Sequence, residues 1–493
     1  MTARDTITVV ITAIIAVAMT VGVSAAGDLR LIEAVRAKNG ERVRALIAEH
    51  VDVNARQGDQ ATALHWAAHL DDGTTVDLLL RSGARADVAD DTGATPLYLA
   101  CVNGNAEVVA RLLDAGANAK TSLPSGETTL MTCARSGNAT AVRALIRHGA
   151  VVNARESAHN QTALMWAAAQ SHPDAVAALL EGGADVRARS REYAQTVTSE
   201  VTQRAGREEL NYTVPRGGST ALLFAARSGD AESAGRLVAS GADVNDALPD
   251  GSSALIVAAH SGHTHVAEML LDKGADANAG AVGYTALHAA VLRSDLPLVK
   301  ALLAHGANPN SPITRGTPVL RNSQAFELPK TLIGATPYLL AAKFLEADIM
   351  RALAAGGADT RIRMKDGATP LMAAAGMGIV APAQDEKRGT DRRGLAILDG
   401  GIVEPESRVL EAVVTALALG SDIDAANPSG ETALHIASAQ GYDTSVTALV
   451  EHGANLNARN AKGQTPLGAL LARKSPSKTS GTIELLRKLG AGV

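Results

Sequence analysis

The densest group of imidazole side chains in the chain consists of His260, His263 and His265. Imidazole nitrogens bind transition metals, but a zinc site draws three or four ligands from His, Cys, Asp and Glu. No cluster of carboxylates or cysteines completes this group, and His263 follows Gly262 at a position that a structural repeat explains. The sequence therefore predicts no metal site.

Two further patterns could in principle carry chemistry. The segment Gly376 to Ala381 has the glycine spacing of a dinucleotide-binding loop, but no predicted strand precedes it, as that loop requires. The acidic pairs Asp71-Asp72 and Asp90-Asp91 fall in turns, where Asp is common for local reasons. Hydrolase, phosphate-loop, zinc-peptidase and Cys-x-x-Cys motifs are absent. We expect no catalytic residue and no cofactor, and we predict that the protein is not an enzyme.

The chain has two cysteines, Cys101 and Cys133. Both fall in predicted helices of neighbouring repeats, but one residue out of step with each other. A disulfide needs its two Cα atoms within about 7 Å, and we do not expect adjacent layers at this offset to meet that condition. Both cysteines are predicted to be small buried side chains, so cysteine usage gives little information about the cellular compartment.

The N-terminus contains an apolar run from Ile7 to Val23, followed by the small residues Ser24, Ala25 and Ala26. This order is typical of a secretory signal peptide with cleavage after Ala25 or Ala26. The run also reaches the lower length limit of a membrane-spanning helix. We expect a cleaved signal over residues 1–26 and a periplasmic or secreted bacterial protein, with an uncleaved anchor formed by residues 7–23 as the alternative.

The composition favours thin helical layers. Hydrophobic residues make up 46% of the 493 residues but aromatic residues only 2%, so the apolar content is mostly Ala, Leu and Val. The net charge of −5 argues against a general nucleic-acid binder, which would be basic. Self-similarity recurs about every 33 residues, and two helices per unit are predicted.

Each unit carries residues with defined mechanical roles. A Thr begins the first helix as its N-cap, sometimes followed by Pro, as in Thr95-Pro96. A Leu two residues after the Thr, such as Leu97, is predicted to contact the core. A Gly such as Gly116 ends the second helix in the left-handed conformation.

These units resemble the ankyrin repeat, whose Thr-Pro-Leu-His-x-Ala signature is present as Thr62 to Ala67 and as Thr285 to Ala290. The resemblance implies an all-α ankyrin solenoid of about twelve helix-turn-helix units with β-turn or hairpin tips. It also implies that His65, His288 and His435, which occupy the His position, hydrogen-bond local backbone. The layout is similar to that of exported bacterial ankyrin-repeat proteins of unassigned function.

Departures from the repeat period define the expected organisation. Repeats 1–5 occupy residues 27–189, with the first as a cap; repeats 6–8 occupy 217–310, and repeats 9–12 with a C-terminal cap occupy 334–493. Insertions are expected at 190–216, 311–333 and 376–405. Insertions of this length are either functional or disordered, and the first two could extend over the binding groove.

The resemblance implies that partners dock on a concave surface lined by the first helices. The position after the Ala-rich part of each first helix is predicted to face this groove. From repeat 4 to repeat 9, the residues at this position that are not Ala or Leu are basic or can become so: Arg135, Arg227, His260 and Lys343. They predict a preference for an acidic peptide or anionic polymer. Alternatively, the cations simply complement helix dipoles.

Trp66, Trp166 and Phe224 share one position of the first helix. A Trp there could anchor a partner or fill space between layers, and the Leu-like character of the position favours packing. We therefore expect a monomeric, non-catalytic scaffold for protein–protein interaction that binds a partner of unknown identity, without nucleic acid or further membrane contact. The alternatives are an enzyme or enzyme-linked regulator with a site in the insertions, and a secreted effector that binds host proteins.

Overall fold

The computed structural model describes residues 28–201, 208–316, 332–377, 406–473 and 479–493. The expected signal or anchor at residues 1–26 and nearly all of the third insertion lie outside these ranges. The described part is helical apart from one β-hairpin, in agreement with the predicted all-α class. It divides into two units, unit 1 with residues 1–191 and 217–243 and unit 2 with residues 192–216 and 244–493.

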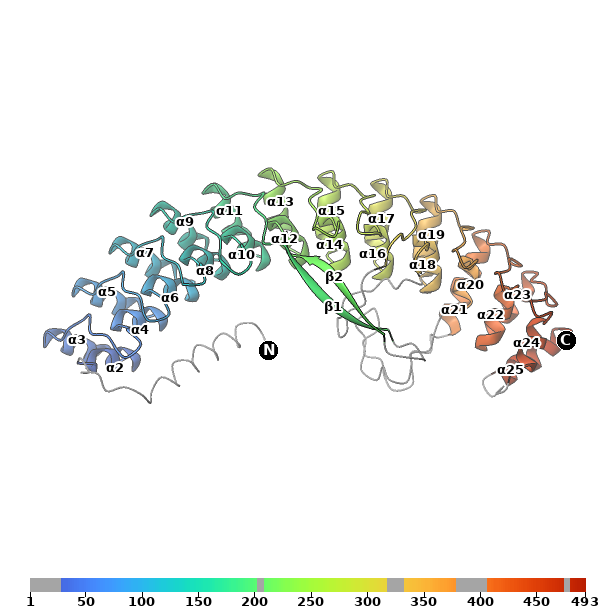
Figure 1. The fold of residues 1–493 in the computed structure, drawn as a ribbon, viewed down its shortest axis with the longest axis horizontal. Helices are drawn as coiled ribbons and strands as arrows, with labels where there is room; N and C mark the ends of the chain where they lie inside the picture. The colour runs from blue at the N-terminus through green and yellow to red at the C-terminus, as the bar shows by residue number, and fades with distance from the viewer. Residues whose placement is uncertain (1–27, 202–207, 317–331, 378–405, 474–478) are drawn as a thin grey trace. The chain divides into compact units, whose positions relative to one another are not determined.

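Unit 1 is a stack of helix pairs in two rows (Figure 1). In each pair a first helix is followed by a second helix; each first helix packs on the first helix of the next pair, and the second helices pack in the same way from the second pair onward. The first helices are α2 (Arg30–Arg36), α4 (Ala63–His69), α6 (Pro96–Asn103), α8 (Thr129–Ser136), α10 (Ala163–Ala169) and α12 (Ala221–Ser228). The second helices are α3 (Gly40–Ala48), α5 (Gly73–Arg81), α7 (Ala106–Asp114), α9 (Ala139–Arg147), α11 (Pro173–Glu181) and α13 (Ala231–Ala239).

Unit 2 repeats this arrangement. Its first helices are α14 (Ala254–Ser261), α16 (Ala286–Leu292), α18 (Pro337–Lys343), α20 (Pro370–Ala374), α22 (Ala433–Gln440) and α24 (Pro466–Leu471). Its second helices are α15 (Thr264–Asp272), α17 (Leu296–Ala304), α19 (Ala347–Ala355), α21 (Glu406–Ala418), α23 (Asp443–Glu451) and α25 (Ser480–Lys488).

The first insertion forms an antiparallel hairpin of β1 (Tyr193–Val201) and β2 (Glu208–Arg216), which the sequence analysis did not predict. Tyr193 pairs with Arg216 and Val201 pairs with Glu208 at the two ends of the ladder. The repeat stack continues across the insertion, because α10 packs on α12 and Ser219 N–H donates to Ser190 Oγ at 3.0 Å.

The residues predicted to start and to end the helices act as predicted. The Thr95 hydroxyl accepts the N–H of Tyr98 at 3.2 Å, and Pro96 occupies the first turn. Asn and Asp cap many second helices in the same way, as Asn105 does for α7. Gly116 follows α7 with φ 89°, a left-handed conformation that glycine adopts without a steric penalty.

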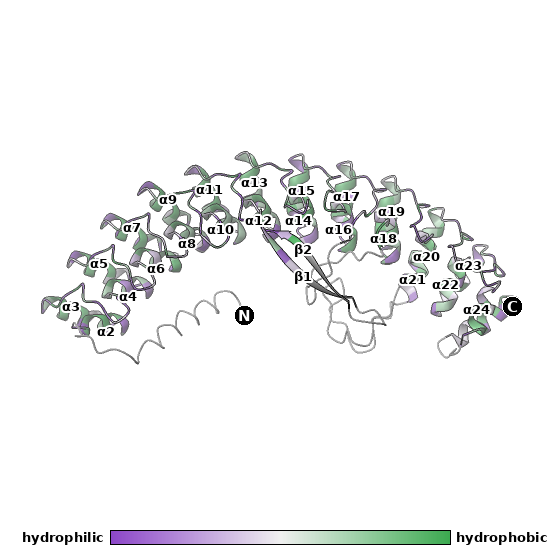
Figure 2. Cartoon of the chain, in the orientation of Figure 1, coloured by the Kyte–Doolittle hydropathy of each residue, from purple (hydrophilic) through white to green (hydrophobic). Residues whose placement is uncertain are grey.

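The core of each layer consists of Leu, Val and Ala, and the hydrophobic residues follow the helices (Figure 2). The signature leucines are almost completely buried; Leu64, Leu97 and Leu130 expose 1% or less. Small residues at the layer contacts, such as Ala67 and Ala68, allow close helix approach and expose 0%. Side chains such as Trp66 and Arg135 on the first helices remain partly exposed beside this core.

Cys101 and Cys133 form a disulfide, so the prediction of two unpaired cysteines is wrong. Their Cα atoms are 4.5 Å apart, well within the range that a disulfide requires. The sequence argument aligned α6 and α8 by counting residues from their Thr caps. It assumed that only positions with the same count face each other. At this seam of small residues, the helices approach closely enough for positions one residue out of step to face each other.

Candidate functional site

The three signature histidines hydrogen-bond local backbone, as the resemblance implied, since Nδ1 of His65, His288 and His435 accepts the N–H of the Thr that caps its helix. His65 Nδ1 lies 2.9 Å from the Thr62 hydroxyl and accepts the Thr62 N–H at 3.2 Å, while its Nε2 lies 3.2 Å from the Ala94 carbonyl of the next repeat. His435 makes the same contacts with Thr432 and the Gln464 carbonyl. Burial lowers the pKa of both imidazoles, which favours their neutral form. Each ring joins a helix start to the following repeat.

The other residues that could have carried chemistry also have local roles. Asp72 caps α5, Asp90 Oδ1 accepts the N–H groups of its own turn, and Asp71 accepts from Asn105 Nδ2 at 2.6 Å. Gly376 follows helix α20 rather than a strand, which removes the context of a dinucleotide loop. Within the described ranges, no three His, Cys, Asp or Glu residues are grouped closely enough to hold a metal ion.

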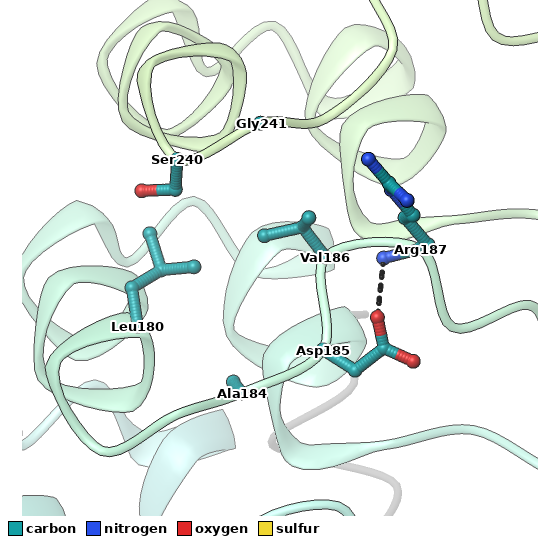
Figure 3. Close-up of a pocket in the computed structure, with 7 residues that line it drawn as sticks. All are labelled: Leu180, Ala184, Asp185, Val186, Arg187, Ser240 and Gly241. Carbon is teal, nitrogen blue, oxygen red and sulfur yellow. Dashed lines mark hydrogen bonds between the residues drawn. The ribbon is translucent and has the colours of Figure 1, made fainter.

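A shallow pocket of about 380 Å³ lies between the ends of α11 and α13 in unit 1 (Figure 3). Its lining consists of Leu180, Ala184, Asp185, Val186, Arg187, Ser240 and Gly241. Asp185 Oδ1 accepts the backbone N–H of Arg187 at 2.9 Å, so this carboxylate stabilises the turn. The lining contains one carboxylate and one guanidinium but no second acid or imidazole, which does not constitute a general acid–base pair.

The surface of unit 1 with the greatest recognition potential is formed by its first helices. Residues three apart on a helix share a face. In each repeat two such positions follow the buried Leu, as Trp66 and His69 follow Leu64 in α4. We define this first-helix face by the partly or fully exposed side chains Glu33, Arg36, Trp66, His69, Leu99, Val102, Arg135, Trp166, Ala169, Phe224 and Arg227. The face therefore combines aromatic, aliphatic and cationic side chains with one carboxylate, that of Glu33.

Both tryptophans lie at the surface and are stacked by an arginine of the preceding repeat. Arg36 Cζ lies 4.6 Å from the centroid of a Trp66 ring, and Arg135 Cζ lies 4.9 Å from that of Trp166. These are cation–π geometries. Each indole N–H is satisfied, by a glutamine side-chain oxygen at 3.2 Å for Trp66 and at 2.9 Å for Trp166. Each ring packs against the preceding repeat and stays partly exposed, so the predicted packing role and the alternative of a partner anchor both stay open.

Arg135 belongs to a polar network that sequence reasoning missed. Glu127, which immediately precedes the Thr cap of α8, lies 3.4 Å from the Arg135 guanidinium and accepts hydrogen bonds from Thr132 and Tyr98 at 2.9 and 3.2 Å. Burial and the Glu127 carboxylate raise the pKa of Tyr98 to about 12, so its hydroxyl stays protonated and donates. The positive charge of Arg135 is thus partly neutralised by the chain itself.

The four predicted contact residues all lie in the last turns of first helices. Arg135 in α8 and Arg227 in α12 share the first-helix face of unit 1, with α10 between them. In unit 2, His260 and Lys343 lie near the C-terminal ends of α14 and α18, with α16 between those helices. Arg36 was missed because the first repeat lacks the signature that set the alignment.

This architecture, a stack of short helix pairs with hydrogen-bonded turns, defines a helical-repeat solenoid. A sequence model of the ankyrin repeat family matches residues 31–122, 111–190, 213–313 and 407–491. The chain therefore belongs to the ankyrin-repeat family, as the residues implied. Among solved structures, the human ASB11 ankyrin repeat domain is similar, with 26% sequence identity and a TM-score of 0.40; the match covers 50% of this chain and 98% of that one.

Ankyrin repeats are in general modules for protein–protein interaction, and the fold is typically non-catalytic. No helix within the described residues combines the length and apolar character needed to span a bilayer.

Proposed function

We propose that this protein is a non-catalytic scaffold that binds a protein partner through the first-helix face of unit 1. The observation that carries the proposal is the concentration of half-buried Trp66, Trp166 and Phe224 with arginines on one face. Trp, Tyr and Arg are the residue types that most often dominate binding free energy at protein interfaces. A rigid stack also presents them with little conformational entropy to lose.

The composition of this face favours a partner segment that is both apolar and acidic. Arg36 and Arg227 are exposed, and Arg135 is partly so. Arg135, Arg227, His260 and Lys343 remain proposed contacts, the last two on unit 2. The dipole alternative accounts for a cation at a helix end but not for its stacking on a tryptophan.

A matched pair of substitutions tests the docking face. Ala169 in α10 lies on the first-helix face, and Ala177 in α11 of the same repeat lies on the second row. Ala169→Glu should reduce capture of a partner from the native envelope fraction at least tenfold, since it places a repulsive charge at the contact. Ala177→Glu should leave capture unchanged. Equal capture by both variants and the unmodified chain would refute the docking face.

We also propose export, with the chain working in the periplasm or outside the cell. The apolar run at residues 7–23 supports a signal or anchor, and the Cys101–Cys133 disulfide is of the kind that persists in oxidising compartments. N-terminal sequencing of the protein from fractionated cells distinguishes the two forms. A start at Ala26 or Gly27 in the soluble envelope fraction is expected; a start at Met1 in the membrane fraction would favour an anchor.

A further inference from the structure

Two sites on unit 1 have the same construction, and the comparison between them is informative. Arg36 and Arg135 each occupy the seventh position after the N-cap of their helix, and each stacks on the tryptophan of the next repeat. In both sites the indole N–H is satisfied by a glutamine. One ring face is therefore covered and the indole donor is used, which leaves the edges of the guanidinium as the polar groups of the site.

The two sites differ in what the guanidinium edge meets. Arg135 has Glu127, the residue just before the N-cap of α8, at 3.4 Å. The residue at the same place before α2 is Asp28, which is also acidic, but Asp28 pairs with Arg30 at 2.6 Å. Among the residues that the structure describes, no carboxylate lies within ion-pair distance of Arg36. The exposed Glu33, one turn earlier on α2, makes no ion pair with it.

The surroundings of Arg36 are suited to holding a carboxylate from another molecule. Trp66 is fixed from a second side by His69, whose ring lies edge-on at a centroid distance of 5.8 Å. Lys38 donates to the Leu70 carbonyl at 3.3 Å and brings a second positive charge to the same end of the helices. Leu99 on the neighbouring α6 is partly exposed, so apolar surface continues beside the cations.

We propose that Arg36, stacked on Trp66, is a carboxylate-binding subsite that takes an Asp or Glu side chain of a protein partner. An apolar residue beside that carboxylate packs on Trp66 and Leu99. Glu127 shows, within the same chain, the group that such an arginine–tryptophan pair accepts. A guanidinium whose face is stacked is oriented for in-plane hydrogen bonds to carboxylate oxygens. This inference rests on the proposed function and adds the chemistry of the partner.

The fluorescence of Trp66 provides the test, because the chain has two tryptophans and Trp166→Phe leaves Trp66 as the single reporter. The probes are two short peptides of equal length, one with alternating Glu and Leu and the other with alternating Gln and Leu. The Glu peptide should shift Trp66 emission with a Kd at least about tenfold lower than that of the Gln peptide. Arg36→Gln should abolish the difference. Arg44→Gln, which removes an exposed arginine of the same repeat from α3, should preserve it.

Several results would overturn the subsite. These are equal binding of the two peptides, no binding of the Glu peptide at millimolar concentration, and an unchanged Kd in Arg36→Gln. Competition by inorganic phosphate as strong as that of the Glu peptide would instead indicate a general anion site. If Ala169→Glu abolishes partner capture while Arg36→Gln does not, the docking face stands and only the carboxylate subsite fails. If neither substitution affects capture, the proposed function fails.

Discussion

Removal of the buried Cys101–Cys133 disulfide should lower the stability of unit 1 substantially. The two residues are separated by 32 positions, and both expose 0% of their surface. Closing a loop of this length restricts the unfolded chain by roughly 3 to 4 kcal/mol in the chain-entropy description. The disulfide joins α6 to α8, so the effect should fall on the contact between two neighbouring repeats.

The architecture determines how the loss should appear. In a repeat stack each layer contacts only its neighbours, and stability is approximately the sum of layer and interface contributions. Weakening one interface should therefore separate a first unfolding transition from the rest rather than shift a single transition uniformly. Because the disulfide is buried, reductant should act on it only after local unfolding.

The assay is urea unfolding followed by circular dichroism, for the unmodified chain and for Cys101→Ala/Cys133→Ala, each with and without reductant. Reductant and the double substitution should both lower the first midpoint, and reductant should not affect the double variant further. Comparison with reduced protein separates loss of the crosslink from loss of sulfur volume, which the alanines also remove. Alkylation of two thiols in urea without reductant, or identical midpoints for all samples, would refute the reasoning.

Three further predictions concern single side chains. Burial lowers the pKa of His288 to about 4, below its ordinary 6.5. The contribution of the neutral ring to folding stability is therefore complete above pH 6.5 and is lost as the pH drops toward 4, and it amounts to on the order of 3 kcal/mol. Urea midpoints of His288→Gln should accordingly depend less on pH than those of the unmodified chain. Glu181→Gln breaks an exposed ion pair of 2.8 Å with Arg143, and its thermal midpoint should match that of the unmodified chain at high and low salt. Glu127→Gln removes the carboxylate that pairs with Arg135. In a Trp66→Phe background, where Trp166 is the single reporter, the Glu–Leu peptide should therefore perturb Trp166 emission several-fold more strongly in Glu127→Gln than with Glu127 in place.

The sequence was sufficient for the fold because its local signals agree with one another. Caps such as Thr95, leucines such as Leu97 and glycines such as Gly116 each specify a helix start, a core contact or a helix end, and they recur in phase. The hairpin was missed because the insertion was recognised by its charges, as a break in the helical repeat, and was not examined for the alternation of a strand. The alternation of Thr and Val in Tyr193–Val201 was the available strand signal.

The site could be predicted only in part, because its contacts cross between repeats. A column of aligned positions located Arg135 and Arg227 on one face, but it gave no information on which neighbour each cation meets. Glu127 lies in a turn, outside the column, and reaches Arg135 only once α8 is formed. The disulfide was missed for the same reason, since the relative offset of stacked helices depends on packing rather than on residue count.

The tryptophans lie beside closely packed layers and keep part of their surface exposed. Each is followed by two alanines, Ala67 and Ala68 or Ala167 and Ala168, that expose 0% and set a narrow spacing between layers. Trp66 and Trp166 are only partly buried beside these alanines, so part of their apolar area stays in contact with water. Stacking an arginine on each ring offsets only part of that cost. In other repeats this position holds smaller buried side chains, such as Ala289 and Leu340. The proposed docking face would use this exposed ring area, with Arg36 and Arg135 stacked beside it.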